Sequence, residues 1–108
     1  MLIVTTPIIE GKPIKEYKGL AFSQVVKGFS WTKSFSAGFL NITGGRSQGH
    51  EDIIEEGREQ AILEIIEDAK RKGANAIVGF NLEFEMISGT SNSNGLLMTK
   101  AIGTAVVL

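Results

Sequence analysis

Cysteine is absent from this 108-residue sequence, and histidine occurs once, as His50. Without cysteine the chain has no disulfide, no thiolate metal ligand and no cysteine nucleophile. A single imidazole removes most of the remaining histidine chemistry, and no Ser–His–Asp arrangement can be assembled with any specificity. We therefore expect a protein without catalysis and without a cofactor.

An excess of charge of one sign is also missing. The chain has 11 Lys and Arg against 12 Asp and Glu, which gives a formal net charge of −1 at pH 7. No overall basic field exists to attract nucleic acid or acidic lipid. We expect neither nucleic acid nor a membrane as a partner.

Long hydrophobic runs are missing as well, because no apolar stretch approaches the roughly 20 residues that cross a bilayer as a helix. The opening Met1–Val4 has no basic segment before it and is interrupted by Thr5, Thr6 and Pro7. This pattern disfavours a signal peptide and predicts a first strand. We expect a soluble, cytoplasmic protein.

The composition that is present, 43% hydrophobic and 21% charged residues, is that of one globular domain spanning residues 1–108. Ile14 to Phe22 predicts a strand. A short helix over about residues 31–43 follows from helical spacing and from the stop at Gly44-Gly45. The apolar residues at that spacing are Trp31, Phe35, Phe39 and Ile42.

A long helix over about residues 47–72 is the clearest element. Ser47 is a candidate N-cap, and Gly73 stands where a left-handed residue commonly ends a helix. Arg58 lies inside the apolar stripe, where it either extends along the apolar surface or pairs with a carboxylate across a subunit contact. The stripe consists of Ile54, Ala61, Ile62, Ile65 and Ala69.

Residues 76–86 alternate apolar and polar side chains and predict a half-buried strand, with Phe80, Leu82, Phe84 and Met86 on one side. Residues 88–95 are rich in Ser, Asn and Gly and predict a hairpin loop before a final strand over residues 96–108. The expected fold is α+β, a small antiparallel sheet packed against the long helix and the short helix.

Apolar side chains occupy both faces of the final strand. One face would carry Met98, Ile102, Val106 and Leu108, and the other Leu97, Ala101, Gly103, Ala105 and Val107. One helix layer covers only one face of a small sheet. We expect another copy of the chain to cover the second face; the alternatives are the short helix or the terminal residues of the same chain.

A glycine-rich turn, Gly44-Gly45-Arg46-Ser47, precedes the long helix, where free N–H groups and the helix dipole could bind an anion or small ligand. Gly44 to Gly49 has the glycine spacing of a phosphate-binding loop. His50-Glu51 stands where Lys and Ser or Thr are required, so an NTPase is excluded. A tight turn between helices, capped by Ser47, is the favoured interpretation.

Glu83 and Glu85 project from one strand face, roughly 6.6 Å apart along the strand. This spacing could hold a hard cation or supply a general acid and base. A solvated strand face explains the same alternation more simply. His50 does not align with Glu51 or Asp52, because only residues three or four apart face each other on a helix, so His50 predicts no metal site.

Several short motifs occur in order along nearly the whole chain. They are Thr5-Thr6-Pro7, Gly11, Tyr17, Gly19, Gly28, Gly44-Gly45-Arg46-Ser47 with Glu51, Gly73-Ala74-Asn75-Ala76-Ile77-Val78-Gly79, and Gly103-Thr104-Ala105-Val106. In these motifs and their spacing the chain resembles the YbjQ-like proteins, a small bacterial family labelled heavy-metal-binding and otherwise of unknown function. The resemblance implies an α+β subunit that assembles as a ring-shaped pentamer, and it implies no catalytic residue.

The chain departs from the family pattern at three places. Ser23-Gln24 stands where an acidic residue usually follows a glycine, Lys33-Ser34 where Arg-Asp is usual, and His50 where tyrosine is usual. With no cysteine and one histidine, the chain also lacks the soft ligands that heavy metals prefer.

Our leading prediction is a cytoplasmic homo-oligomer, pentameric by the resemblance, that binds or scaffolds a partner. One alternative is an anion or small-ligand site at Gly44, Gly45, Arg46 and Ser47. The other is a hard-cation or hydrolytic site that uses Glu83 and Glu85.

Overall fold

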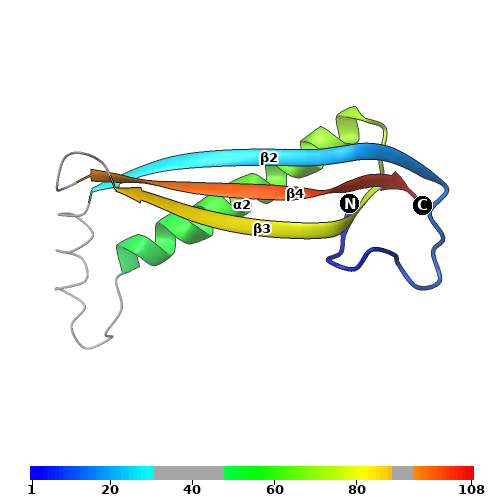
Figure 1. Ribbon diagram of the computed structural model, residues 1–108, viewed down its shortest axis with the longest axis horizontal. Coiled ribbons are helices and arrows are strands. Elements are labelled where there is room, and N and C mark those ends of the chain that lie inside the picture. Colours follow the sequence, from blue (N-terminus) through cyan, green and yellow to red (C-terminus); the bar gives the residue numbers. More distant parts are fainter. Residues whose placement is uncertain (31–47, 89–93) are drawn as a thin grey trace.

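The computed structural model describes residues 1–30, 48–88 and 94–108. Within these ranges four strands form one sheet and one long helix packs on it (Figure 1). In chain order the elements are β1 (Leu2–Ile3), β2 (Glu16–Ser30), α2 (Gln48–Arg71), β3 (Ala76–Ser88) and β4 (Asn94–Val107). The short helix predicted over residues 31–43 lies outside the described residues.

The sheet has the strand order β1-β3-β4-β2, with β4 antiparallel to both of its neighbours. β1 pairs in parallel with β3, with Leu2 opposite Ala76 and Ile3 opposite Ile77. The predicted antiparallel sheet is therefore wrong in this strand, and the sheet is mixed. A parallel pair needs a long crossover connection, and β2 and α2 lie in the connection between β1 and β3.

β2 is longer than the sequence predicts, because it continues past Phe22 to Ser30. Beyond Phe22 the period of two persists, with Ser23 and Val25 buried and Gln24 and Val26 exposed. Small and polar residues on the buried side hide the hydrophobic alternation that identifies a strand.

The predicted long helix is confirmed as α2, within one residue at each end. Its end is closed by Gly73, which has a φ of 81°. The Ala74 N–H donates to the Ala69 carbonyl and the Gly73 N–H donates to the Lys70 carbonyl, each at 3.0 Å. This pair of bonds is a Schellman motif, and it turns the chain directly into β3.

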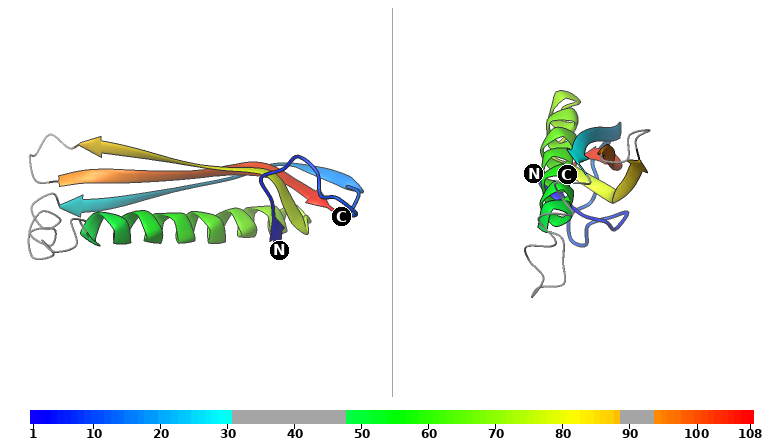
Figure 2. Two further views of the ribbon diagram at one scale, coloured as in Figure 1. Left: turned by 90° about the horizontal axis from the view of Figure 1, so that it is seen from below. Right: turned by 90° about the vertical axis from the view of Figure 1, so that its left-hand side faces the viewer.

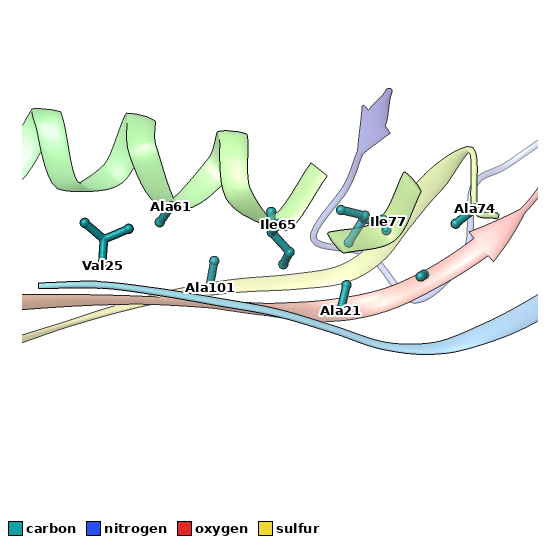
Figure 3. Packing of buried hydrophobic residues seen from close by; sticks show 9 residues of the cluster. Ala21, Val25, Ala61, Ile65, Ala74, Ile77 and Ala101 are labelled. Atoms are coloured by element: carbon teal, nitrogen blue, oxygen red, sulfur yellow. The ribbon is translucent and has the colours of Figure 1, made fainter. Parts of the chain in front are cut away.

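α2 lies on one side of the sheet, over β2 and β4 (Figure 2). The core between them is built mostly from small side chains (Figure 3). Its buried members are Ala21, Val25, Ala61, Ile65, Ala69, Ala74, Ile77, Ala101 and Ala105. Helix and sheet approach so closely at Gly57 that an added Cβ would lie 2.6 Å from Thr99 Oγ1.

The N-terminal segment covers one end of the opposite side of the sheet. Val4, Ile9 and Ile14 pack there, together with Leu108, against the buried cluster Ala76, Val78 and Val106. The Val4 N–H donates to the Ile77 carbonyl at 2.9 Å, which ties the segment to β3. This contact leaves the rest of that side without a covering layer among the described residues.

Candidate functional site

The side of the sheet that faces away from α2 carries large apolar side chains. The register pairs Phe22 with Ile102 and Val26 with Met98, and paired residues project from the same face. Ala21 and Val25 lie on the helix side, so their neighbours along β2 lie on the other. We call this side the helix-free face, formed by Leu20, Phe22, Gln24, Val26, Asn81, Glu83, Glu85, Ile87, Leu96, Met98, Lys100 and Ile102.

Several side chains on the helix-free face are exposed although they are hydrophobic. The exposed fractions are 58% for Leu20, 48% for Val26, 43% for Phe22, 43% for Leu96, 40% for Ile102 and 39% for Ile87. The polar row Gln24, Lys100 and Glu83 separates Phe22 and Ile102 from Val26 and Met98. Exposed apolar patches mark interaction sites in soluble proteins.

The two sides of the final strand differ in how they are covered. Leu97, Ala101 and Ala105 are buried under α2. On the other side Val106 is fully buried by the terminal residues, whereas Ile102 is not. Cover by the chain's own terminal residues, an alternative predicted from the sequence, therefore holds at the Val106 end only.

Glu83 and Glu85 both lie on the helix-free face, as their alternation predicts. Their partners across the ladder are Lys100 and Met98. The Lys100 Nζ lies 3.7 Å from a Glu85 carboxylate oxygen, and both side chains are solvent-accessible. The geometry is that of a surface ion pair on a β ladder, which contributes little to stability.

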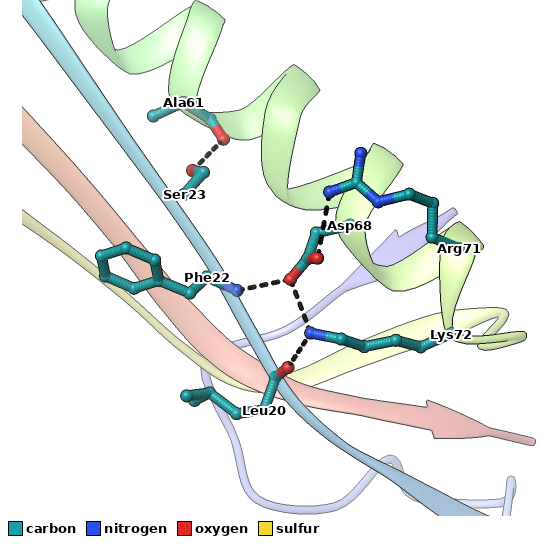
Figure 4. Close-up of polar contacts among 7 residues, drawn as sticks. All are labelled: Leu20, Phe22, Ser23, Ala61, Asp68, Arg71 and Lys72. Atoms are coloured by element: carbon teal, nitrogen blue, oxygen red, sulfur yellow. Dashed lines mark hydrogen bonds and ion pairs between the residues drawn. The ribbon is translucent and has the colours of Figure 1, made fainter.

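A polar cluster that sequence reasoning missed connects the end of α2 to the outer edge of β2 (Figure 4). One oxygen of Asp68 accepts the Phe22 N–H at 3.0 Å and the Lys72 ammonium at 2.9 Å. Lys72 also donates to the Leu20 carbonyl, and Arg71 donates to the second Asp68 oxygen at 3.1 Å. We call this cluster the edge clamp.

The hydrogen bond from Lys72, followed by the one from the Phe22 backbone, lowers the pKa of Asp68 to about 2. The carboxylate is 15% exposed, so its partners are only partly screened by water. The sequence signal was the spacing of Asp68, Arg71 and Lys72 at i+3 and i+4 on one helix. That spacing predicts the ion pairs, but not the strand edge that they reach.

A groove of about 450 Å³ lies beside the edge clamp, between α2 and the outer edge of β2. Phe22, Ser23 and Gln24 line it from the strand, and Glu64, Glu67 and Arg71 line it from the helix. We call this the edge groove. It joins an unpaired strand edge to two acidic side chains.

Two hydroxyls beneath α2 have opposite environments. Ser23 Oγ donates to the Ala61 carbonyl at 2.6 Å. Thr99 is fully buried, and its Oγ1 has no hydrogen-bond partner among the described residues. Gly57 of α2 lies close to this hydroxyl, since a Cβ added there would lie 2.6 Å from Thr99 Oγ1.

Other residues singled out in the sequence fall into two groups. Gly44, Gly45, Arg46 and Ser47 lie outside the described residues. Arg58 is 47% exposed and lies 3.5 Å from Glu55 on its own helix.

In the described part of the chain, no helix is both long and apolar enough to cross a membrane.

Comparison with known proteins identifies relatives over the full length. Residues 1–108 match a family of YbjQ proteins described as "Putative heavy-metal-binding". UPF0145 proteins of Listeria ivanovii and Listeria welshimeri are each 45% identical over 108 residues, covering 100% of this chain and 96% of theirs.

A crystal structure supports the same fold. A protein of unknown function from Pediococcus pentosaceus, assigned to the DUF74 family, superposes with a TM-score of 0.71 at 14% identity. The match covers 100% of this chain and 97% of that one.

The described residues do not fit the metal in the family's description. Within residues 1–30, 48–88 and 94–108, no three His, Cys, Asp or Glu side chains come together to hold an ion. The paired oxygens of Glu83 and Glu85 suit hard cations rather than heavy metals, and Lys100 already neutralises Glu85. By sequence over its whole length, the chain belongs to the YbjQ-like family.

Proposed function

We propose that this protein is a homo-oligomeric binding or scaffolding subunit, without catalysis, whose copies bury the helix-free face. The observation that carries the proposal is the set of large apolar side chains left exposed there, which includes Phe22 opposite Ile102. Burying roughly 400 Å² per subunit would contribute about 10 kcal/mol at ~25 cal/mol per Å², before the entropy of association.

A closed ring of five subunits, in the cytoplasm, is the form of the proposal that the family resemblance favours. Homo-oligomers with cyclic symmetry bury the same surfaces in every copy. A ring would therefore hide the helix-free face of each subunit without leaving an unmatched end.

Sedimentation velocity at micromolar concentration tests the assembly. We expect the natural chain to sediment as an oligomer and Ile102→Lys to sediment as a folded monomer, because a new charge beside Phe22 opposes burial of this apolar patch. Leu63→Lys is the matched control, since Leu63 is 60% exposed on the outer side of α2.

The control should remain oligomeric with an unchanged circular dichroism spectrum. A natural chain that sediments as a single monomeric species would overturn the proposal. Dissociation by Leu63→Lys but not by Ile102→Lys would assign the contact to the helix instead of the helix-free face.

The two ligand sites from the sequence stay as predictions with separate tests. Phosphate should raise the melting temperature of the natural chain but not of Arg46→Ala if the Gly44–Ser47 turn binds anions. Calcium or manganese should bind less tightly to the Glu83→Gln/Glu85→Gln variant if those carboxylates hold a hard cation.

A further inference from the structure

β2 is an edge strand, because it pairs only with β4 in the described part of the sheet. The edge clamp shows which of its backbone groups point outward, since the Phe22 N–H and the Leu20 carbonyl both reach side chains of α2. Backbone direction alternates along a strand, so Gln24, Val26 and Gly28 also point their N–H and C=O groups outward.

The edge clamp divides this edge into two parts. At Leu20 and Phe22 the outward groups are bonded to Lys72 and Asp68. From Gln24 to Gly28 no described side chain bonds to the outward backbone groups. Unpaired N–H and C=O groups in a row are a template for another strand.

The second part of the edge borders two acidic side chains where it begins, at Gln24. The edge groove is lined by Phe22, Ser23 and Gln24 on the strand and by Glu64 and Glu67 on the helix. Both carboxylates are exposed, and no cationic side chain of the described residues lies within 4.0 Å of either. Arg71, the one cation in the groove, is bonded to Asp68.

We propose that the β2 edge from Gln24 to Gly28 binds an extended peptide as an added antiparallel strand, with a Lys or Arg side chain of the peptide against Glu64 and Glu67. An added strand lies about 4.8 Å from β2 and turns every second side chain toward the helix side. Main-chain bonds supply affinity in this mode, and the side chains that face the groove supply specificity. The inference rests on the binding role proposed above, and not on the number of subunits.

A peptide fits this edge better than a second copy of the chain. β3 pairs with β1 at Ala76 and Ile77 only. Its remaining length is an alternative partner for β2, but β3 contains no Lys or Arg and brings no cation to the groove. Pairing β2 with β2 of another copy would bring the Glu64 and Glu67 flanks of two helices toward each other, and like charges oppose such contacts.

The first test uses a fluorescein-labelled synthetic peptide of seven residues that alternates Val and Lys, titrated with the full chain and followed by anisotropy. A matched peptide with Glu in place of Lys should bind at least about tenfold more weakly, and added salt should reduce the difference.

N-methylated forms of the Val–Lys peptide test the strand geometry. Opposite residues of an antiparallel pair project from the same face, so peptide residues opposite Gln24 and Val26 face away from the helix and donate to β2. With Lys turned toward Glu64 and Glu67, these donors are the Val amides. Methylation of the Val amides should therefore abolish binding, and methylation of the Lys amides should not.

The second test changes the protein. Gln24→Pro removes one outward N–H without removing a bond to β4, and edge strands tolerate proline in that position. It should weaken binding of the Val–Lys peptide about tenfold or more, whereas Gln24→Ala, which keeps the N–H, should not. Glu64→Gln/Glu67→Gln should remove the preference for Lys over Glu.

Equal affinity of the Lys and Glu peptides, or equal effects of the two methylations, would overturn the inference. If Gln24→Pro fails to fold, the N-methylated peptides titrated with the natural chain still test whether the peptide binds as an added strand. A smaller sedimentation coefficient for Gln24→Pro would show that a second copy occupies the edge, which also overturns it. Ile102→Lys separates the two proposals, because it should dissociate the oligomer and leave peptide binding intact.

Discussion

The two faces of the sheet differ in the size of their side chains. Beneath α2 the strands present small residues, among them Ala21, Ala101 and Ala105, and the helix meets them with Gly57 and Ala61. The helix-free face carries larger side chains on β2 and β4, and Leu20, Phe22 and Ile102 among them are exposed. On the helix side, large apolar side chains lie on β3, where Phe84 and Met86 are exposed. A domain stabilised only by its own core would place its largest apolar side chains inside.

Close approach explains the small residues, since a helix can pack tightly on a sheet only where side chains are short. The core that results holds few large side chains; those that are fully buried include Ile65, Ile77, Leu97 and Val106. Part of the apolar content therefore lies outside the core, and the assembly proposed above would link its burial to folding.

The largest expected effect comes from placing one aromatic ring on each face of β4. Ala101 is fully buried beneath α2, and Ala101→Phe should lower the free energy of unfolding by about 3 kcal/mol through overpacking. Ile102→Phe, one residue away on the helix-free face, should change it by less than about 1 kcal/mol. Urea titrations at equal protein concentration measure both, and equal losses would contradict the difference between the faces.

A smaller effect is expected at the edge clamp, which holds α2 to the sheet. The pKa of Asp68 is lowered from 3.8 to about 2, so its ionised form stabilises the folded state. Asp68→Asn should lower the free energy of unfolding by about 2 kcal/mol at pH 7, at ~1.4 kcal/mol per pKa unit.

The pH dependence has a definite sign. Above about pH 5 the carboxylate is ionised in both states and its contribution is complete. As the pH falls through about 4 toward 2, the unfolded chain takes up the proton first and the contribution is lost progressively. The gap between the natural chain and Asp68→Asn should therefore close across this range. Glu67→Gln is the control, because Glu67 is an exposed carboxylate with no part in the clamp. A gap that stays constant from pH 7 to pH 2 would refute the assignment.

The smallest effect compares the two hydroxyls under α2. Thr99→Val should raise the free energy of unfolding by about 1 kcal/mol, because it removes a buried hydroxyl without a partner. Ser23→Ala should lower it by about 1 kcal/mol, because that hydroxyl bonds to the Ala61 carbonyl. Thermal unfolding distinguishes stabilisation by Thr99→Val from destabilisation by Ser23→Ala. Destabilisation by Thr99→Val would mean that the Thr99 hydroxyl is hydrogen-bonded.

Local signals in the sequence predict much of this fold. Ser47 and Gly73 predict the bounds of α2 within one residue at each end, and the alternation from Phe80 to Met86 predicts which side chains of β3 share the side that faces the helix. The apolar character of both sides of β4 also follows from the order of its residues alone.

The rest depends on contacts between distant segments. Parallel pairing of Leu2 with Ala76 leaves no local pattern, and the buried face of β2 past Phe22 is too small and polar to read as a strand. The edge clamp joins Asp68 to Phe22, 46 residues apart. Its charges are visible on the helix, but the strand edge that they meet is set by tertiary packing.

The edge clamp also bears on aggregation through the edge of the sheet. A 15-residue border strand is long enough to recruit copies of itself into a fibril, in which every main-chain group is satisfied by the next molecule. Asp68 and Lys72 place a carboxylate and an ammonium on that border, where an incoming strand would have to displace both. Fibril growth through this edge is thereby interrupted at Leu20 and Phe22. Only the short stretch of the edge from Gln24 to Gly28 is left open to an added strand.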